Sequence, residues 1–577
     1  MQRDLSTLTR QEHDLVVIGG GMFGAAAALD AAQRGLRVAL IERGDFCGAT
    51  SAHSFKMIHG GIRYLQHADL HRLRHSARAR AAFLRVAPHL TRPLPIVVPT
   101  YGRGMKSRPV LRAGMAAYDL LTIDRNRGIP DPVLRIPRGW FLDRAEVLRR
   151  YPGLARDGLT GAGVFCDGQM HNPPRLVLAF VQSAVAAGAA CANRVEAVSL
   201  LRRGDRVTGV VARDRLGGER LEIRGRLVLN AAGPYAEGIL RAGLGQGLTP
   251  PTPFSRDAYL IVARPLLAGD HALTLPSLTS DPEAILSRGT RHLFLVPWRG
   301  VTLVGVWHKV YAGHPDAFAI GEAELAEWLA EINRAYRGLD LTPDDVTLGS
   351  AGLVPFGEND PQARHLKYAH RSRVVDHGRE RGIEGLISLI GVRFTTAPVE
   401  APRVIDRVVA RIGRKVPPSR LETTPVRGGG GFARFRDLLA DAAATAPPGL
   451  AAAALESLCR NHGSAFGEVL ALAEEQPELA RALPGTHVLA AEIVHAARGE
   501  MALTLADAVF RRTDLCTAGD PGEAALREAA RVMASACGWT ATRREAEVDS
   551  VQRRLRLALS GRSFLDADPP TTPALVA

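Results

Sequence analysis

The stretch from Leu15 to Glu42, LVVIGGGMFGAAAALDAAQRGLRVALIE, constrains the fold more than any other part of the chain. A short apolar run from Leu15 to Ile18 predicts a buried strand, and three nearby glycines predict a tight turn after it. An alanine-rich segment through Arg34 predicts a helix, and Arg37 to Ile41 predicts a second strand. This order of elements is the βαβ unit of a nucleotide-binding fold.

The glycines and the acid of this unit fall where a dinucleotide needs them. Gly19 permits the tight turn, Gly21 leaves room for a pyrophosphate, and Gly24 lets the helix lie close to the strand. The helix amino terminus then faces the phosphates, and Glu42 offers a carboxylate to ribose hydroxyls. An acid at this place repels a 2′-phosphate, so the pattern predicts dinucleotide binding and disfavours NADP.

Length and composition predict a multidomain enzyme. The chain has 577 residues, 46% of them hydrophobic, which is enough for two to four domains. Its six cysteines lack CxxC or metal-ligand spacing, so we expect no disulfide framework and no metal. The polar start, MQRDLSTLTRQEHD, does not resemble a secretory signal, and no segment is apolar enough to span a bilayer, so a cytoplasmic protein is expected.

The net charge of +14 comes mostly from arginine and attracts anions of every kind. A phosphorylated substrate and peripheral contact with the inner face of a membrane are both compatible with this charge, and so is a simple coding bias towards arginine. Aromatic residues make up only 5% of the chain and do not alternate with basic runs, so no nucleic-acid partner is expected.

A polar, glycine-bearing loop follows Glu42 where a nicotinamide dehydrogenase usually continues into another helix. The loop ends in KMIHGGIRYL, from Lys56 to Leu65. This segment resembles the FAD-dependent glycerol-3-phosphate dehydrogenase family, within a wider superfamily of flavin oxidoreductases. The segment AEIVHAARGEMALTLADAVFRRT resembles the carboxy-terminal domain of that family, so the resemblance spans nearly the whole chain.

The resemblance implies an extended FAD site. The glycine turn and Glu42 begin it, and the strand ending in Asn230 to Pro234 is implied to be its second segment, although an ordinary strand exit would look similar. A helix opening near Thr395 would aim backbone N–H groups at the flavin O2 edge. The expected cofactor-binding residues are Gly19, Gly21, Gly24, Glu42, Thr50, Ser51, Lys56, Val195, Ala232, Gly233, Gly391 and Thr395.

The chain is expected to be α/β, or α+β overall, with three parts. A discontinuous Rossmann-like FAD domain takes 1–90, 161–250 and 356–426, and an antiparallel-sheet substrate domain takes 91–160 and 251–355. After a glycine-rich linker at 427–431, residues 432–565 are expected to form an independent helical cap, and 566–577 a frayed tail.

His59, Arg63 and Arg393 are the expected catalytic residues. Oxidation of an alcohol by flavin needs a group that takes the hydroxyl proton and groups that fix the substrate. His59 suits the first role and Arg63 the second, and the two share a face if their segment is helical. A packed histidine under the cofactor and a surface salt bridge are the alternatives for these two residues.

The chain departs from the family pattern in its substrate region. Val354 stands where relatives carry a substrate-binding arginine, and Arg393 replaces a lysine. The segment VWH, which ends in His308, stands where the family has TTD. His308 and Lys309 are candidates to face the substrate, and the alternative is a solvated pair at the end of a strand. Arg256 is a further candidate for contact with an anion. Loss of one charge-assisted contact would cost about 1.5–3 kcal/mol in binding a dianion.

The predicted function is therefore FAD-dependent oxidation of a secondary alcohol, first of all sn-glycerol 3-phosphate to dihydroxyacetone phosphate. Electrons would pass to quinone or another acceptor. A flavin enzyme of the same superfamily acting on another polyol, hydroxy acid or amine remains the alternative. From other classes, a flavin-binding protein without turnover and a flavoprotein associated with nucleic acid remain open.

Overall fold

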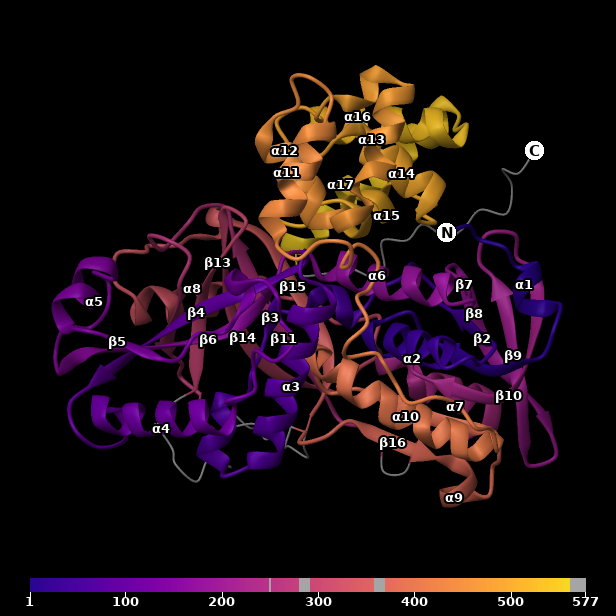
Figure 1. The fold of residues 1–577 in the computed structure, drawn as a ribbon, viewed down its shortest axis with the longest axis horizontal. Helices are drawn as coiled ribbons and strands as arrows, with labels where there is room; N and C mark the ends of the chain where they lie inside the picture. Colours follow the sequence, from indigo (N-terminus) through magenta and orange to yellow (C-terminus); the bar gives the residue numbers. More distant parts are fainter. Residues whose placement is uncertain (249–250, 280–290, 357–368, 561–577) are drawn as a thin grey trace.

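Two β-sheets lie side by side in the computed structural model, which describes residues 1–248, 251–279, 291–356 and 369–560 (Figure 1). Helices cover both sheets, and a cluster of carboxy-terminal helices sits above them. The expected tail at 566–577 lies outside the described residues. The α/β class with a Rossmann-like part and a helical carboxy-terminal part is confirmed.

The first sheet has a parallel centre built around β1 (His13–Ile18). β1 pairs in parallel with β2 on one side, Leu15 opposite Val38, and with β10 on the other, Leu15 opposite Leu227. The strand order is β16-β17-β10-β1-β2-β7, with β8 and β9 continuing from β10 as an antiparallel extension. The remaining strands are β2 (Val38–Ile41), β7 (Ala190–Ala192), β8 (Val195–Arg203), β9 (Arg206–Asp214), β10 (Arg220–Asn230), β16 (Arg373–Asp376) and β17 (Leu386–Ile390).

Helix α2 (Met22–Gln33) is the buried helix of the βαβ unit. It packs against the sheet and between α6 (Pro173–Ala186) and α10 (Ala397–Ile412), so almost all of its residues are enclosed. Apart from Asp30, which pairs with Arg34 at 3.2 Å, and Gln33 at its end, the helix is apolar on every side, as suits a helix enclosed in this way. Its alanines keep the helix thin enough for two neighbours to approach it.

The second sheet is largely antiparallel and lies beside the first. Its order is β15-β11-β14-β13-β12-β4-β6-β3, and β5 pairs with β6. The strands are β3 (Met57–Ile58), β4 (Thr91–Tyr101), β5 (Trp140–Leu142), β6 (Leu159–Met170), β11 (Phe254–Val262), β12 (Ala272–Pro276), β13 (His292–Trp298), β14 (Val301–Tyr311) and β15 (Val346–Pro355).

The domain boundary expected at residue 161 falls inside strand β6. This strand pairs along its whole length with β4, so it belongs to the second sheet. Strand β3, from the loop that follows the βαβ unit, joins the same sheet. The loop that was assigned to the cofactor domain is thus tied to the substrate sheet. Cross-strand pairing at this distance leaves no local sequence signal.

The remaining helices around the sheets are α1 (Ser6–Thr9), α3 (Leu70–Val86), α4 (Arg108–Leu121), α5 (Arg144–Arg150), α7 (Ala236–Leu244), α8 (Glu322–Ala335) and α9 (His377–Arg381). None of the helices within the described ranges is long and apolar enough to cross a membrane.

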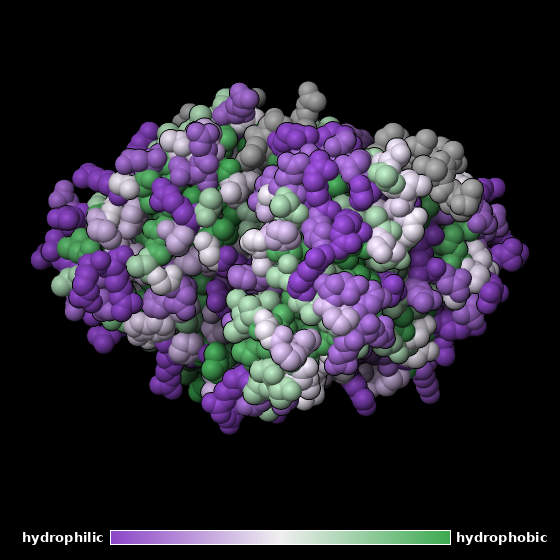
Figure 2. Space-filling model, turned by 90° about the horizontal axis from the view of Figure 1, so that it is seen from above, coloured by the Kyte–Doolittle hydropathy of each residue, from purple (hydrophilic) through white to green (hydrophobic). Residues whose placement is uncertain are grey.

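The carboxy-terminal helices share one hydrophobic core with the second sheet. They are α11 (Phe435–Thr445), α12 (Ala452–His462), α13 (Phe466–Glu475), α14 (Ala490–Gly499), α15 (Leu505–Asp507), α16 (Glu523–Cys537) and α17 (Ala541–Ser560). Their core continues into that of the second sheet through residues such as Ile96 and Trp298. The outer face that carries these helices mixes hydrophilic residues with small hydrophobic groups (Figure 2).

The glycine run before these helices is packed rather than a free linker. A Cβ at Gly428 would lie 2.3 Å from the carbonyl oxygen of His462, and a Cβ at Gly463 would lie 1.9 Å from that of Gly428. The two backbones cross at van der Waals contact, which only glycine allows. The run was expected to be a linker because composition alone cannot separate a flexible glycine from a crowded one.

Candidate active site

A cavity of about 2130 Å³ lies between the two sheets. The glycine turn, the loop after β2, the ends of β10 and β17 and one face of the second sheet all contribute to its lining. The cavity is larger than the 300–1,000 Å³ typical of sites for small ligands, as expected if it holds a cofactor and a substrate together.

The glycine turn is crowded where a dinucleotide fold requires it to be. Gly19 has φ +108°, and a Cβ there would lie 2.7 Å from the carbonyl oxygen of Ala231. A Cβ at Gly24 would lie 1.9 Å from the carbonyl oxygen of Gly19, so this glycine permits the close approach of α2 to β1. Gly21 immediately precedes the helix and lines the cavity.

Glu42 lines the cavity at the end of β2, beside the glycine turn. Its Oε2 accepts from the backbone N–H of Gly20 at 2.7 Å and its Oε1 from that of Gly44 at 2.8 Å. Burial raises the pKa of this carboxyl in spite of those two bonds. The carboxylate is therefore fixed beside the turn, as a ribose contact requires.

Thr50 and Ser51 lie in a 3₁₀ turn (Thr50–His53) that lines the cavity. The Ser51 hydroxyl accepts from the backbone N–H of Met22 at 3.0 Å, at the first turn of α2. The Thr50 hydroxyl donates to the carbonyl oxygen of Leu353 in β15 at 2.9 Å. Ser51 thus lies at the helix amino terminus, where the phosphates are expected, while Thr50 ties the loop to the second sheet.

Lys56 lies behind this loop and is not among the residues lining the cavity. Its ammonium group donates to the hydroxyl of Tyr259 and lies 4.7 Å and 4.8 Å from the ring centroids of Tyr259 and Trp298. The side chain is 4% exposed. This position suits a buried cation that supports the loop, and it gives no direct sign of a cofactor contact.

The other expected cofactor residues line the same cavity. Ala232 and Gly233 follow β10, and Val195 at the start of β8 donates its N–H to the carbonyl oxygen of Glu42 at 2.8 Å. Gly391 follows β17 and packs against the Phe23 ring, which a Cβ would overlap. Thr395 lies in a 3₁₀ turn (Phe394–Thr396) that leads into α10. These residues, together with the turn and Glu42, fit an extended FAD.

His59 faces the cavity and contacts a buried acid behind it. Its Nδ1 lies 3.3 Å from Oδ2 of Asp167, on β6. Oδ1 of the same carboxylate accepts from the Gly60 N–H at 2.7 Å and from Arg80 Nη1 at 3.0 Å. Burial would raise the pKa of Asp167, but the His59 hydrogen bond and the Arg80 charge outweigh it and lower the pKa below its usual value.

His59 and Arg63 do not share a helix. Gly61 between them has φ +87° and precedes a 3₁₀ turn that begins only at Ile62, so no helix contains both residues. The condition under which the two would share a helical face is therefore not met. Both side chains nevertheless line the cavity.

Arg393 lines the cavity and immediately precedes the 3₁₀ turn that leads into α10. Its Nη1 donates to the hydroxyl of Tyr64 and, at 3.3 Å, to that of Ser76. The Tyr64 ring also lies 5.2 Å from this guanidinium. Tyr64, which sequence reasoning did not single out, therefore sets the position of Arg393; its place directly after Arg63 was the available signal.

The substrate sheet presents Val354, Asp257 and His308 to the cavity. Nδ1 of His308 lies 2.8 Å from Oδ1 of Asp257, and the Ser255 hydroxyl donates to the same carboxylate oxygen at 2.8 Å. Ser255 lies opposite Val354 in the β11–β15 pair. Asp257 was missed because a single acid in an alternating strand carries no pattern.

Arg256 and Lys309 point to the opposite face of that sheet. Both bind Glu324 of α8, with N–O distances of 2.6 Å and 3.2 Å. Side chains alternate along a strand, so the neighbours of Asp257 and His308 must face away from the cavity. The expectation that Arg256 and Lys309 face the substrate is therefore wrong.

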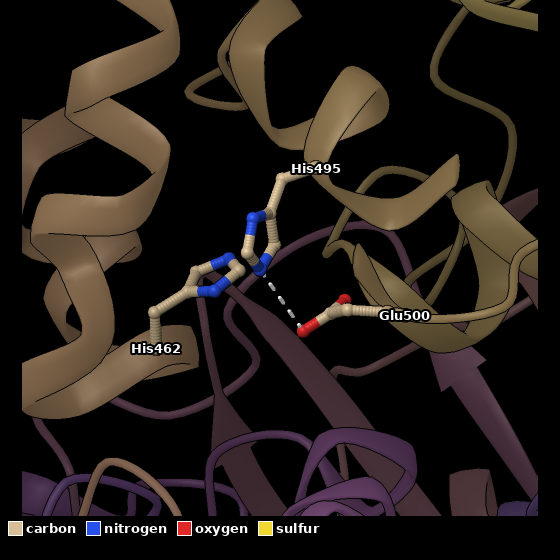
Figure 3. Close-up of side chains that lie close together, drawn as sticks. All are labelled: His462, His495 and Glu500. Carbon is tan, nitrogen blue, oxygen red and sulfur yellow. Dashed lines mark ion pairs between the residues drawn. The ribbon is translucent and has the colours of Figure 1, made fainter. Parts of the chain in front are cut away.

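One group of possible metal ligands, His462, His495 and Glu500, lies within the described ranges (Figure 3). Arg175 donates to Oε2 of Glu500 at 2.6 Å, and its Nη2 lies 3.1 Å from Nδ1 of His462. A guanidinium beside two of the three groups already supplies the positive charge and would repel a cation. This geometry favours a hydrogen-bonded network over a metal centre.

Comparison with known proteins agrees with the site. Residues 14–399 match the FAD dependent oxidoreductase family, and residues 419–544 match the C-terminal domain of alpha-glycerophosphate oxidase. A glycerol-3-phosphate dehydrogenase of Mycobacterium leprae is 32% identical over 94% of this chain and 88% of its own. One from Synechocystis is 30% identical over 93% and 95%.

A solved structure also shares the fold. The glycerol-3-phosphate dehydrogenase of Bacillus halodurans, complexed with FAD, superposes with a TM-score of 0.72 at 24% identity and covers 96% of both chains. At this identity the likeness concerns the fold alone. The family match and the two relatives decide the assignment: the chain belongs to the family of FAD-dependent oxidoreductases, among relatives that are glycerol-3-phosphate dehydrogenases.

Proposed function

We propose that this enzyme oxidises sn-glycerol 3-phosphate to dihydroxyacetone phosphate. The observation that carries the proposal is the placement of His59, Arg63 and Arg393 on the same cavity as the glycine turn and Glu42. The names of the relatives favour this substrate. When bound, FAD supplies a two-electron acceptor whose N5 takes the hydride.

His59 is proposed to take the hydroxyl proton. With Asp167 accepting from Nδ1–H, the neutral imidazole keeps its lone pair on Nε2, which is free of that contact and can accept a proton from the substrate hydroxyl. The carboxylate of Asp167 then stabilises the imidazolium that forms. Asp167 in turn is held by Arg80 and the Gly60 N–H, so the ring keeps its orientation.

Arg63 and Arg393 are proposed to bind the phosphate. Both line the cavity, and guanidinium groups match phosphate oxygens in a bidentate manner. Tyr64 orients Arg393 through its hydroxyl. The two arginines would hold the substrate so that its C2–H points towards the cofactor and its hydroxyl towards His59.

Glu42, Ser51 and the amino terminus of α2 are proposed to hold the FAD, with Gly19, Gly21, Gly24, Val195, Ala232, Gly233, Gly391 and Thr395 around them. Each suits a part of the cofactor: a carboxylate for ribose, a helix terminus and a hydroxyl for phosphate, and small residues where the backbone must approach. Thr50 shares the same turn. Lys56 is proposed to support this loop from behind.

A second candidate is oxidation of a neutral polyol, a hydroxy acid or an amine, and Val354 is the observation that favours it. This valine gives the cavity an apolar surface beside Ser255, and the nearby carboxylate of Asp257, 2.8 Å from Nδ1 of His308, lies on the same face of the sheet. Such a surface is less suited to a dianion than an arginine would be.

Anaerobic bleaching of the flavin separates the two candidates. We expect glycerol 3-phosphate at millimolar concentration to bleach the bound flavin, and glycerol, hydroxy acids and amines to leave it oxidised. Bleaching by one of the other compounds, with none by the phosphate, would support the second candidate instead.

We also propose peripheral contact between α4 and the inner face of an anionic membrane, with quinone as the electron acceptor. Leu120 on α4 and Ile123, two residues after its end, are 72% and 73% exposed, and Arg112 on α4 is exposed as well. Several α4 residues border the cavity, and the helix lies on the side opposite the carboxy-terminal helices (Figure 1). Apolar side chains flanked by cations bind interfaces of this kind.

Sedimentation with vesicles tests this contact. Vesicles rich in anionic lipid should retain the wild-type enzyme, and the double variant L120E/I123E should bind them much less while keeping its flavin. The exposed Val133, on a neighbouring turn, gives a control in the variant V133E. Equal binding of all three proteins would contradict the role of α4.

A further inference from the structure

A buried carboxylate ties the cofactor loop to the carboxy-terminal helices. Asp45 lies three residues after Glu42, and its side chain is fully enclosed. Oδ2 accepts from Arg511 Nε at 2.6 Å and from Arg512 Nη1 at 2.7 Å. Oδ1 accepts from Arg512 Nη2 at 2.7 Å and from Asn193 Nδ2 at 2.9 Å. We call these four residues the Asp45 cluster.

The two arginines come from one π-helical turn (Ala508–Arg512) after α15, a form that is rare and frequent at functional sites. Consecutive residues of this turn reach one carboxylate. Arg511 is also held by Asp507, and Arg512 Nε donates to the carbonyl oxygen of Glu500 at 3.0 Å. The arginines are therefore fixed from their own side before they reach Asp45.

The cluster is strongly charged although it is buried. Burial would raise the pKa of Asp45, but Arg512 and Arg511 outweigh it and hold the pKa far below its usual range. The carboxylate is thus ionised, and separating it from the arginines would leave buried charges without partners. Such a contact resists opening much more than a surface pair does.

The loop carries this constraint to the glycine turn in two steps. The Cys47 N–H, two residues after Asp45, donates to the carbonyl oxygen of Gly20 at 3.0 Å. Glu42, three residues before it, accepts from the N–H of Gly20 at 2.7 Å. Asp45 therefore anchors the loop between two contacts to the residue that precedes Gly21, and Arg511 itself lines the cofactor cavity.

From this path we infer that the Asp45 cluster positions FAD: through it the carboxy-terminal helices hold the cofactor loop against the glycine turn. Asp45, Arg511 and Arg512 act through Glu42 and the glycine turn. This role concerns retention of the cofactor and does not depend on which substrate the enzyme oxidises.

The chain offers a matched pair of residues for the test. Glu500, on the carboxy-terminal side, binds Arg175 of α6 at 2.6 Å across the same boundary, and both side chains are buried. That pair docks the helices without touching the cofactor loop. Asp45→Asn and Glu500→Gln are both isosteric and neutralise one buried carboxylate each, so they differ mainly in the place where the helices are loosened.

The experiment measures the rate of FAD release from the holoenzyme of each variant, by the gain of flavin fluorescence on dilution, together with the thermal unfolding midpoint. We expect Asp45→Asn to release FAD about tenfold faster than the wild type, or more. Glu500→Gln should lower the thermal unfolding midpoint by a similar amount but release FAD at close to the wild-type rate. Release rates that follow the midpoint equally in both variants would overturn the inference.

A milder variant keeps the test open if Asp45→Asn does not fold. Arg512→Lys retains the charge but loses the bidentate contact with the Asp45 carboxylate. We expect it to release FAD faster than wild type and to alter the visible circular dichroism of the bound flavin. The exposed Arg527, paired with Glu523 on α16, supplies the control Arg527→Gln. A wild-type release rate in Arg512→Lys would overturn the inference as well.

Discussion

Asp167→Asn tests whether the buried array behind His59 is as important as its geometry indicates. The substitution keeps the shape of the side chain and an oxygen that can accept from the Gly60 N–H, but it removes the negative charge beside Arg80. Arg80 is 0% exposed, so its charge would lose its buried counterion. The array would then contain an uncompensated cation next to the active site.

Neutralising one partner of a buried ion pair costs about 3–5 kcal/mol. Because the amide oxygen of asparagine replaces one acceptor, we expect a value near the lower end, about 3 kcal/mol, or roughly a hundredfold in the local opening equilibrium. His59 also loses the carboxylate that fixes its tautomer and stabilises its protonated form. We therefore expect kcat to fall by about a hundredfold or more, with a smaller change in KM.

Hydrogen exchange of the β6 and α3 amides measures the stability effect, since it reports local opening energies in a chain too large for a single unfolding transition. Stopped-flow reduction of the flavin measures the catalytic effect. Asp124→Asn is the control, because Asp124 pairs with Arg74 at 2.6 Å in the same way but is 52% exposed. The control should change stability by about 0.5 kcal/mol or less. An equal, small effect of both substitutions would show that the buried charge of Asp167 is no more important than an exposed one.

Three further predictions concern the cofactor, the carboxy-terminal helices and the substrate. Gly24→Ala should yield protein largely without flavin, because its Cβ would lie 1.9 Å from the carbonyl oxygen of Gly19. Gly467→Ala, whose Cβ would have nothing within 4 Å, should keep one flavin per chain, and the flavin absorbance of the purified variants measures both. Burial raises the pKa of Glu492 to about 8, so its proton stabilises the fold fully below about pH 4.5 and this stability is lost as the pH rises through 8. Glu492→Gln should remove this loss, which we put at a few kcal/mol; hydrogen exchange of the α14 amides, compared at pH 5 and pH 8.5, measures it, and an unchanged pH dependence would contradict the assignment. Val354→Arg should lower KM for glycerol 3-phosphate by about one to two decades relative to Val354→Leu, and no difference between the two variants would place the phosphate elsewhere.

Local patterns were sufficient for part of the site. The βαβ unit was predictable because its strand, turn, helix and acid are consecutive, and the crowding at Gly19 and Gly24 is what that reading requires. The resemblance carried by KMIHGGIRYL pointed to His59 and Arg63, and both line the cavity.

Long-range contacts were not predictable in this way. Asp167 lies 108 residues after His59 and reaches it only because β3 pairs with β6. Arg511 lies 466 residues after Asp45, and nothing near either residue signals the contact. Strand alternation, once the register is known, also explains why His308 faces the cavity while Lys309 does not. The substrate side therefore needed the register of the second sheet, which the sequence pattern left undetermined.

The visible absorption spectrum of the purified enzyme, recorded before and after anaerobic addition of glycerol 3-phosphate, shows both whether the chain binds FAD and whether this substrate reduces it. We expect the bands of oxidised flavin, one FAD per chain, and their loss when the substrate is added. A colourless protein that stays free of flavin after incubation with excess FAD would contradict this expectation.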